Sequence, residues 1–128
     1  MPGNALLSVY DKTGLDRLAW IFSKLQVKML GSGGTAEAVK ADPVNFRKAV
    51  DNIDIGGVAL IRAAGKGALL NHRVVPVTSP KQYEGVVGEL ERKGYVGNEL
   101  RQQLAREAFV LTADYDGAIR DYLAGQAR

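Results

Sequence analysis

The chain has 128 residues, of which 46% are hydrophobic and 24% charged, and its formal net charge is +3. This length predicts a single domain, residues 1–128, and the composition is that of a folded globular protein. The absence of cysteine excludes disulfides, thiolate metal sites and cysteine nucleophiles, and a single histidine argues against a histidine-based metal centre or triad.

The hydrophobic pattern also excludes broad classes of protein. No apolar run approaches the roughly 20 residues that span a bilayer, so no membrane segment is expected. The N-terminus lacks the basic region and long apolar stretch of a secretion signal, which predicts a cytoplasmic location. Lysine and arginine are spread along the chain, a distribution that favours a small phosphorylated ligand over a nucleic acid.

Strands and helices alternate in the N-terminal part of the predicted structure. Residues 5–10 form a short β-prone apolar run, and residues 15–25 have apolar positions at helical spacing. Residues 27–30 predict a second strand, which is followed by a glycine-rich turn and good helix formers. This order predicts two strand–loop–helix units.

The second half continues with helices and one more candidate strand. After Pro43, residues 45–52 predict a short helix, and residues 58–64 suit either a buried strand or a buried helix, with the helix favoured. Residues 73–79 predict a strand, although Pro76 restricts it to a sheet edge or an early end. Two helices follow, and the last is expected to break between residues 112 and 117. The alternation predicts an α/β layered sandwich with a parallel sheet.

Two loops carry phosphate-binding signals. Ser32, Gly33, Gly34 and Thr35 follow a strand and lead into a helix, where free backbone N–H groups attract an anion. A tight turn with Thr35 as helix N-cap explains the same residues, so both interpretations stay open. Lys12 and Thr13 lie in the loop after the first strand. Because ligands bind beyond the carboxyl ends of parallel strands, both loops are expected to face one crevice, with Tyr10 at its rim.

Asp54, Ile55, Gly56, Gly57 and Lys66 form the other candidate site. Asp54 suits the N-cap of the following helix, and Lys66 suits a solvated lysine near a helix end. A continuous helix would separate the two side chains by roughly 18 Å along its axis. They can act on one small group only if Gly65 and Gly67 end the helix early, and otherwise they contact opposite parts of an elongated ligand.

Four stretches, in matching order, resemble one known family: "ALLSVYDKTGL", "SGGTAEAV", "AVDNIDIGGVALIRAAGK" and "RQQLAREAFVLTADYDGAIRDYL". They are similar to the IMP cyclohydrolase domain of the bifunctional purine-biosynthesis enzyme AICAR transformylase/IMP cyclohydrolase. The resemblance implies a small methylglyoxal-synthase-like layered sandwich, in which a parallel sheet is flanked by helices. It also implies a hydrolase-class reaction without metal or cofactor, in which the carboxamide nitrogen of formyl-AICAR attacks the formyl carbon and water leaves to give IMP.

The resemblance also implies residue roles. Lys12, Thr13 and residues 32–35 would hold the nucleotide, with its phosphate at the SGGT turn, while Asp54, Ile55, Gly56 and Gly57 line the base and Lys66 is catalytic. A carboxylate can accept the carboxamide proton, and an ammonium can stabilise charge on the formyl oxygen.

The chain departs from the family pattern between its second and third stretches. A block with K-T-L-H-P and N-L-Y-P motifs is missing and is replaced by a short segment around residues 42–48, and the transformylase domain is absent. A reduced sheet of about three strands is expected, and its exposed edge would favour a homodimer. A non-catalytic nucleotide-binding module and an internally deleted remnant are the alternatives to an enzyme.

Overall fold

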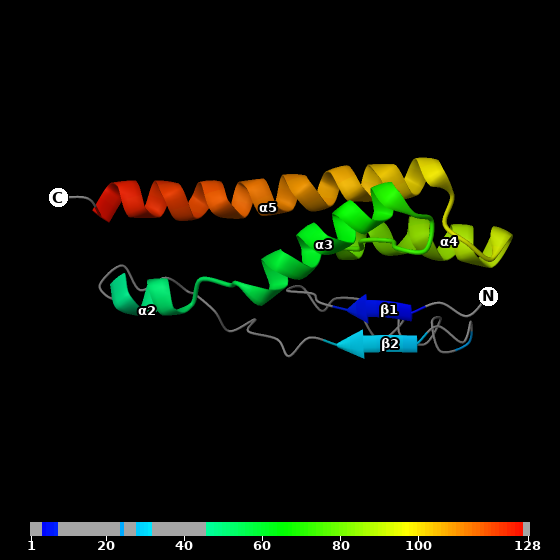
Figure 1. Cartoon of the computed structure of the whole chain (residues 1–128), viewed down its shortest axis with the longest axis horizontal. Coiled ribbons are helices and arrows are strands. Elements are labelled where there is room, and N and C mark those ends of the chain that lie inside the picture. Colours follow the sequence, from blue (N-terminus) through cyan, green and yellow to red (C-terminus); the bar gives the residue numbers. More distant parts are fainter. Residues whose placement is uncertain (1–3, 8–23, 25–27, 32–45, 127–128) are drawn as a thin grey trace.

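The computed structural model describes residues 4–7, 24, 28–31 and 46–126. Within them the chain forms two strands followed by a set of helices (Figure 1). The elements are β1 (Asn4–Leu7), β2 (Lys28–Gly31), α2 (Phe46–Asp51), α3 (Gly56–Leu70), the 3-10 turn η1 (Pro80–Gln82), α4 (Tyr83–Lys93) and α5 (Asn98–Gln126).

The two strands pair in parallel. Asn4 lies opposite Lys28 and Leu7 opposite Gly31, so both strands run in the same direction (Figure 1). β1 overlaps the first half of the predicted strand 5–10, and β2 overlaps most of the predicted strand 27–30. The predicted helix 15–25 and the helix after the glycine-rich turn lie outside the described residues, apart from Lys24. The full layered sandwich therefore stays a prediction.

The strand predicted for residues 73–79 is wrong, because none of them forms a strand. The chain between α3 and η1 pairs with no strand of the described part, and it begins with a turn in which the side chain of Asn71 accepts the N–H of Arg73 (2.9 Å). Pro76 cannot donate to a β-ladder, so the segment instead places Val75 and Val77 against a hydrophobic core. The β-prone residues Val75 and Val77 therefore pack against the core and do not join a sheet.

α3 confirms the helical alternative for residues 58–64 and continues beyond them to Leu70. It packs along α5 (Figure 1). Gly65 is buried in this contact, and a Cβ there would lie 2.9 Å from the ring of Phe109. The early helix end considered for Gly65 and Gly67 is therefore wrong, because the glycines serve close packing and not chain reversal.

The hydrophobic core lies between α4 and the first half of α5. Val86, Val96 and Leu104 are buried at its centre, and partly buried neighbours pack around them: Val75, Val77, Leu90 and Leu100. Gly94 ends α4 with a positive φ of 76°, which a glycine adopts without steric cost, and its N–H donates to the carbonyl of Leu90 (2.9 Å). This turn brings α5 back across α4.

α5 is one helix of 29 residues, so the predicted interruption between residues 112 and 117 is wrong. Thr112 is buried and donates its hydroxyl to the carbonyl of Phe109 (3.2 Å), one turn earlier. The threonine satisfies its polar group inside the helix and has no need to break it. At the far end of α5, the ring of Tyr122 stacks on Phe46 of α2, with centroids 6.3 Å apart.

Candidate functional site

Asp54 is held in place just before α3 begins. Its carboxylate Oδ1 accepts the backbone N–H of Gly57 (3.0 Å), which is one of the helix-start donors that lack a partner within the helix. Its own backbone N–H donates to the phenol oxygen of Tyr115 on α5 (2.8 Å). Ile55 occupies the N-cap position of α3, and Asp54, one residue earlier, supplies the side-chain acceptor for the helix start. The carboxylate therefore has a defined position.

Gly57 and Gly56 differ in what surrounds them. A Cβ on Gly57 would lie 2.2 Å from Oδ2 of Asp54, so the carboxylate lies over the glycine and requires it. A Cβ on Gly56 would meet nothing within 4 Å. The exposed side chain of Ile55, 76% accessible, lies between Asp54 and these glycines in the chain. The start of α3 therefore presents an ordered acid beside an open backbone and an apolar side chain.

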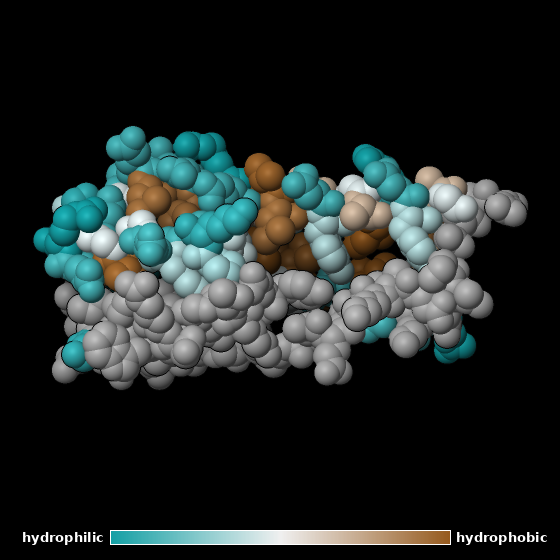
Figure 2. Space-filling model, turned by 180° about the vertical axis from the view of Figure 1, so that it is seen from behind, coloured by the Kyte–Doolittle hydropathy of each residue, from teal (hydrophilic) through white to brown (hydrophobic). Residues whose placement is uncertain are grey.

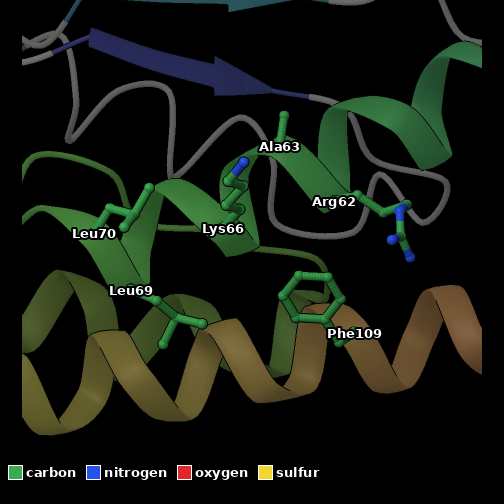
Figure 3. A pocket seen from close by; sticks show the side chains of 6 residues that line it. All are labelled: Arg62, Ala63, Lys66, Leu69, Leu70 and Phe109. Atoms are coloured by element: carbon green, nitrogen blue, oxygen red, sulfur yellow. The ribbon is translucent and has the colours of Figure 1, made fainter.

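Lys66 lines a separate hollow on α3. The hollow has a volume of about 430 Å³ and is lined by Arg62, Ala63, Lys66, Leu69, Leu70 and Phe109 (Figure 3). The guanidinium of Arg62 lies 5.7 Å from the centre of the Phe109 ring, a cation–π distance. The close-up shows Lys66 and Ala63 projecting from one side of α3, with Phe109 below them on α5. Two cations therefore border a mostly apolar hollow.

The structure keeps Asp54 and Lys66 apart. Both belong to the α3 region, but α3 is unbroken from Gly56 to Leu70, so about 18 Å of helix axis separates the two positions. Of the two arrangements considered from the sequence, only contact with opposite parts of an elongated ligand remains within one chain. The predicted nucleotide-binding residues are not among the described ones: Tyr10, Lys12, Thr13, Ser32, Gly33, Gly34 and Thr35.

Tyr115 and Phe109 are neighbours of the site that the sequence did not predict. Both lie on α5, where apolar spacing predicts packing, and Tyr115 is 61 residues from its partner Asp54. No local pattern signals such a contact. His72, the single histidine, lies exposed in the turn after α3.

Arg101 is a buried cation with a structural role. Its Nε donates to the carbonyl of Ala68 near the end of α3 (2.9 Å), and its Nη2 donates to the side chain of Asn98 (2.6 Å). A cation at a helix C-terminus is favourable because of the helix dipole. Arg101 therefore ties the end of α3 to α5.

The described part of the chain has neither a cluster of metal-ligating side chains nor a helix suited to a membrane. No group of three His, Asp or Glu residues there could hold a metal ion. No helix in the same ranges is both long and apolar enough to cross a membrane, because the long α5 is too polar.

Sequence comparison relates the chain to enzymes of purine biosynthesis. The family model of the AICARFT/IMPCHase bienzyme matches residues 68–128. The bifunctional purine biosynthesis protein PurH of Rhodopirellula baltica is 51% identical over 93 residues, which cover 72% of this chain and 17% of that protein. The PurH proteins of Bacillus cytotoxicus and Desulfitobacterium hafniense are 42% and 40% identical, and the matches cover 17% and 16% of those proteins.

Structural comparison agrees at the level of the fold. The crystal structure of ForH has a TM-score of 0.77 at 19% identity, and the match covers 96% of this chain and all of that chain. The two chains therefore have similar lengths and one overall fold. Fold and sequence together define a domain of the purine-biosynthesis type. The chain belongs to the AICARFT/IMPCHase family and spans about one sixth of the length of the PurH relatives that it matches.

Proposed function

We propose that this domain binds a purine nucleotide precursor and closes its ring in an IMP cyclohydrolase-type reaction. The main support is the ordered carboxylate of Asp54 at the start of α3, in a chain related to PurH. Formyl-AICAR is the proposed substrate, or a nucleotide with the same adjacent carboxamide and formylamino groups, and IMP is the product. No metal or other cofactor takes part.

Asp54 acts on the carboxamide. Its Oδ1 is occupied by the N–H of Gly57, which leaves Oδ2 as the oxygen with which to orient the carboxamide and accept its proton. The carboxamide nitrogen then attacks the formyl carbon, and the formyl oxygen leaves as water after it has been protonated. The backbone at Ile55, Gly56 and Gly57 contacts the base.

Lys66 has a different task, because an unbroken α3 separates it from Asp54. Its ammonium stabilises negative charge at another part of the elongated nucleotide, beside the hollow that Phe109 and Arg62 border. The phosphate is assigned to Ser32, Gly33, Gly34 and Thr35, with Lys12, Thr13 and Tyr10 close by.

A non-catalytic nucleotide-binding module is the second candidate. The observation that favours it is the separation of Asp54 from Lys66, which prevents both from acting on one reacting group within one chain. The internally deleted remnant has less support, because ForH has the same fold at a similar chain length.

The test is conversion of formyl-AICAR to IMP, followed by the absorbance of IMP, with wild type, Lys66→Ala and the control Lys81→Ala. We expect slow turnover, because each fixed donor lost with the missing block reduces the rate about 100- to 1,000-fold. Lys66→Ala should weaken nucleotide binding and lower turnover, because it removes a cation that contacts the bound nucleotide, and Lys81→Ala, an exposed lysine of η1, should change neither. If wild type is no faster than buffer but binds IMP, the binding module is correct.

The proposed assembly is a cytoplasmic homodimer. Apolar side chains interrupt the hydrophilic surface of the helices (Figure 2), and large exposed ones include Leu70 (73% accessible), Leu69 and Val110. Burial of such side chains between two copies would remove them from water. Light scattering during size-exclusion chromatography should give twice the mass of one chain.

A further inference from the structure

Tyr115 connects the long helix α5 to the start of α3. Its phenol oxygen accepts the backbone N–H of Asp54 at 2.8 Å, and the contact is partly buried. Asp54 lies two residues before Gly56, the first residue of α3, so its backbone N–H has no acceptor within the helix. The acceptor is supplied from an element that lies 61 residues further along the chain.

Three constraints then define the position of Asp54. Tyr115 holds the backbone N–H, the N–H of Gly57 holds Oδ1, and Oδ2 lies over the α-carbon of Gly57. The hydrogen bond and the close contact with Gly57 are local and move with α3. Among the described residues, the bond to Tyr115 is the one hydrogen bond that relates Asp54 to a second helix, so it sets where the carboxylate lies relative to α5.

We propose that Tyr115 is the positioning residue that sets Asp54 for the carboxamide of the purine precursor. This inference rests on the function proposed for Asp54. Tyr115 acts through the backbone of Asp54 and is not required to touch the substrate. A carboxylate misplaced by about 1 Å loses roughly 100-fold in rate, which is the scale of effect that one positioning bond can have.

Tyr122 provides a matched control on the same helix. Its phenol oxygen is buried with no hydrogen-bond partner in the described part of the chain, and its ring stacks on Phe46. Tyr122→Phe therefore removes a hydroxyl from α5 without removing a described bond to α3. Tyr115→Phe keeps the ring and its packing and removes only the acceptor.

The experiment compares wild type, Tyr115→Phe and Tyr122→Phe. Amide NMR spectra report on the N–H groups of Asp54 and Gly57, kcat and KM are measured with formyl-AICAR, and affinities are measured for AICAR nucleotide and for ribose 5-phosphate, which has no base. We expect Tyr115→Phe to shift the amide resonance of Asp54 and to lower kcat about 10- to 100-fold. It should also weaken the binding of AICAR nucleotide but not the binding of ribose 5-phosphate. Tyr122→Phe should leave all of these unchanged.

Failure of the inference differs from failure of the proposed function. If wild type shows no turnover, the proposed catalytic function is wrong. The positioning role of Tyr115 is then tested by the ratio of the affinities for AICAR nucleotide and ribose 5-phosphate, which should be lower in Tyr115→Phe than in wild type. If wild type does not prefer AICAR nucleotide to ribose 5-phosphate either, Asp54 has no base to recognise and the inference falls as well. A Tyr115→Phe protein with a shifted Asp54 amide but with kcat and AICAR affinity within twofold of wild type would overturn the inference alone.

Discussion

At the scale of single residues, adjacent glycines at the start of α3 have different physical requirements. Gly57 faces the carboxylate of Asp54 at a distance that no Cβ can share, whereas the space beside Gly56 is open. The two glycines are equivalent in the sequence, and only the structure shows that the carboxylate of Asp54 leaves no space for a side chain at position 57.

Gly57→Ala should displace the Asp54 carboxylate and break its bond to the N–H of residue 57. Loss of such a helix cap costs about 1 kcal/mol, and we expect this loss relative to Gly56→Ala, which should be neutral or slightly stabilising. Urea unfolding of the two variants measures the difference. Equal stabilities would show that the carboxylate does not lie over Gly57.

Glu89 supplies a pH-dependent contact at the junction of α4 and α5. The backbone N–H of Gly97, and then the ammonium of Lys93, donate to its carboxylate and hold the pKa of Glu89 below the ordinary glutamate value of 4.5. Because the folded state has the lower pKa, the ionised carboxylate stabilises the fold above pH 4.5. This contribution is lost as the pH falls through the lowered pKa.

Glu89→Gln should therefore reduce the pH dependence of stability in the acid range. The difference in urea midpoint between wild type and Glu89→Gln is expected to shrink as the pH is lowered from 6 to 3. Glu91→Gln, at an exposed position of the same helix, is the control and should leave the shape of the curve unchanged. Parallel curves for wild type and Glu89→Gln would contradict the assignment.

At the scale of elements, the contact between α3 and α5 explains why α3 continues through Gly65. The ring of Phe109 occupies the space that a side chain at position 65 would need, and the guanidinium of Arg62 lies over the same ring. Gly65 weakens the helix locally but allows the two helices to approach. α3 continues because this packing stabilises it.

A double-mutant cycle tests the contact between Gly65 and Phe109. Alanine is favoured over glycine in a helix by about 1 kcal/mol, but crowding of the ring should make Gly65→Ala destabilising by about 1 kcal/mol. In a Phe109→Ala background the space is open, and the same change should stabilise. Gly117→Ala in α5, whose Cβ would meet only an arginine end at 3.8 Å, is the control for helix propensity alone. Additive effects at Gly65 and Phe109 would contradict the close contact.

At the scale of the whole molecule, burial is unevenly distributed along α5. Its first half carries Leu104, Ala105, Ala108 and Thr112 into the interior, whereas no residue from Ala113 to Gly125 is buried. Within the described residues, this second half contacts other elements through the bond from Tyr115 to Asp54 and the stacking of Tyr122 on Phe46.

Hydrogen exchange should follow this distribution. Amides of α4 and of residues 100–112 should exchange slowest, and those of residues 119–126 fastest, because local opening of the exposed half breaks few buried contacts. Mass spectrometry of exchanged peptides measures this gradient. Uniform protection along α5 in a monomeric sample would contradict this distribution of burial.

The sequence by itself determined the family, the helices of the second half and the capping role of Asp54. These features depend on local signals: apolar spacing over α2 and α3, an acid three residues before a helix-start N–H, and motifs in a matching order. Each of these features follows from residues that are close together in the sequence.

Tertiary structure decided the features that depend on a neighbour. Residues 73–77 have the composition of a strand but pack into the α4–α5 core, because Pro76 cannot join a ladder and Val75 and Val77 are needed for burial. α3 continues through Gly65 because the ring of Phe109, on another helix, packs against this glycine. The bond between Asp54 and Tyr115 spans 61 residues, and no local pattern can specify a contact that exists only after the two helices have packed.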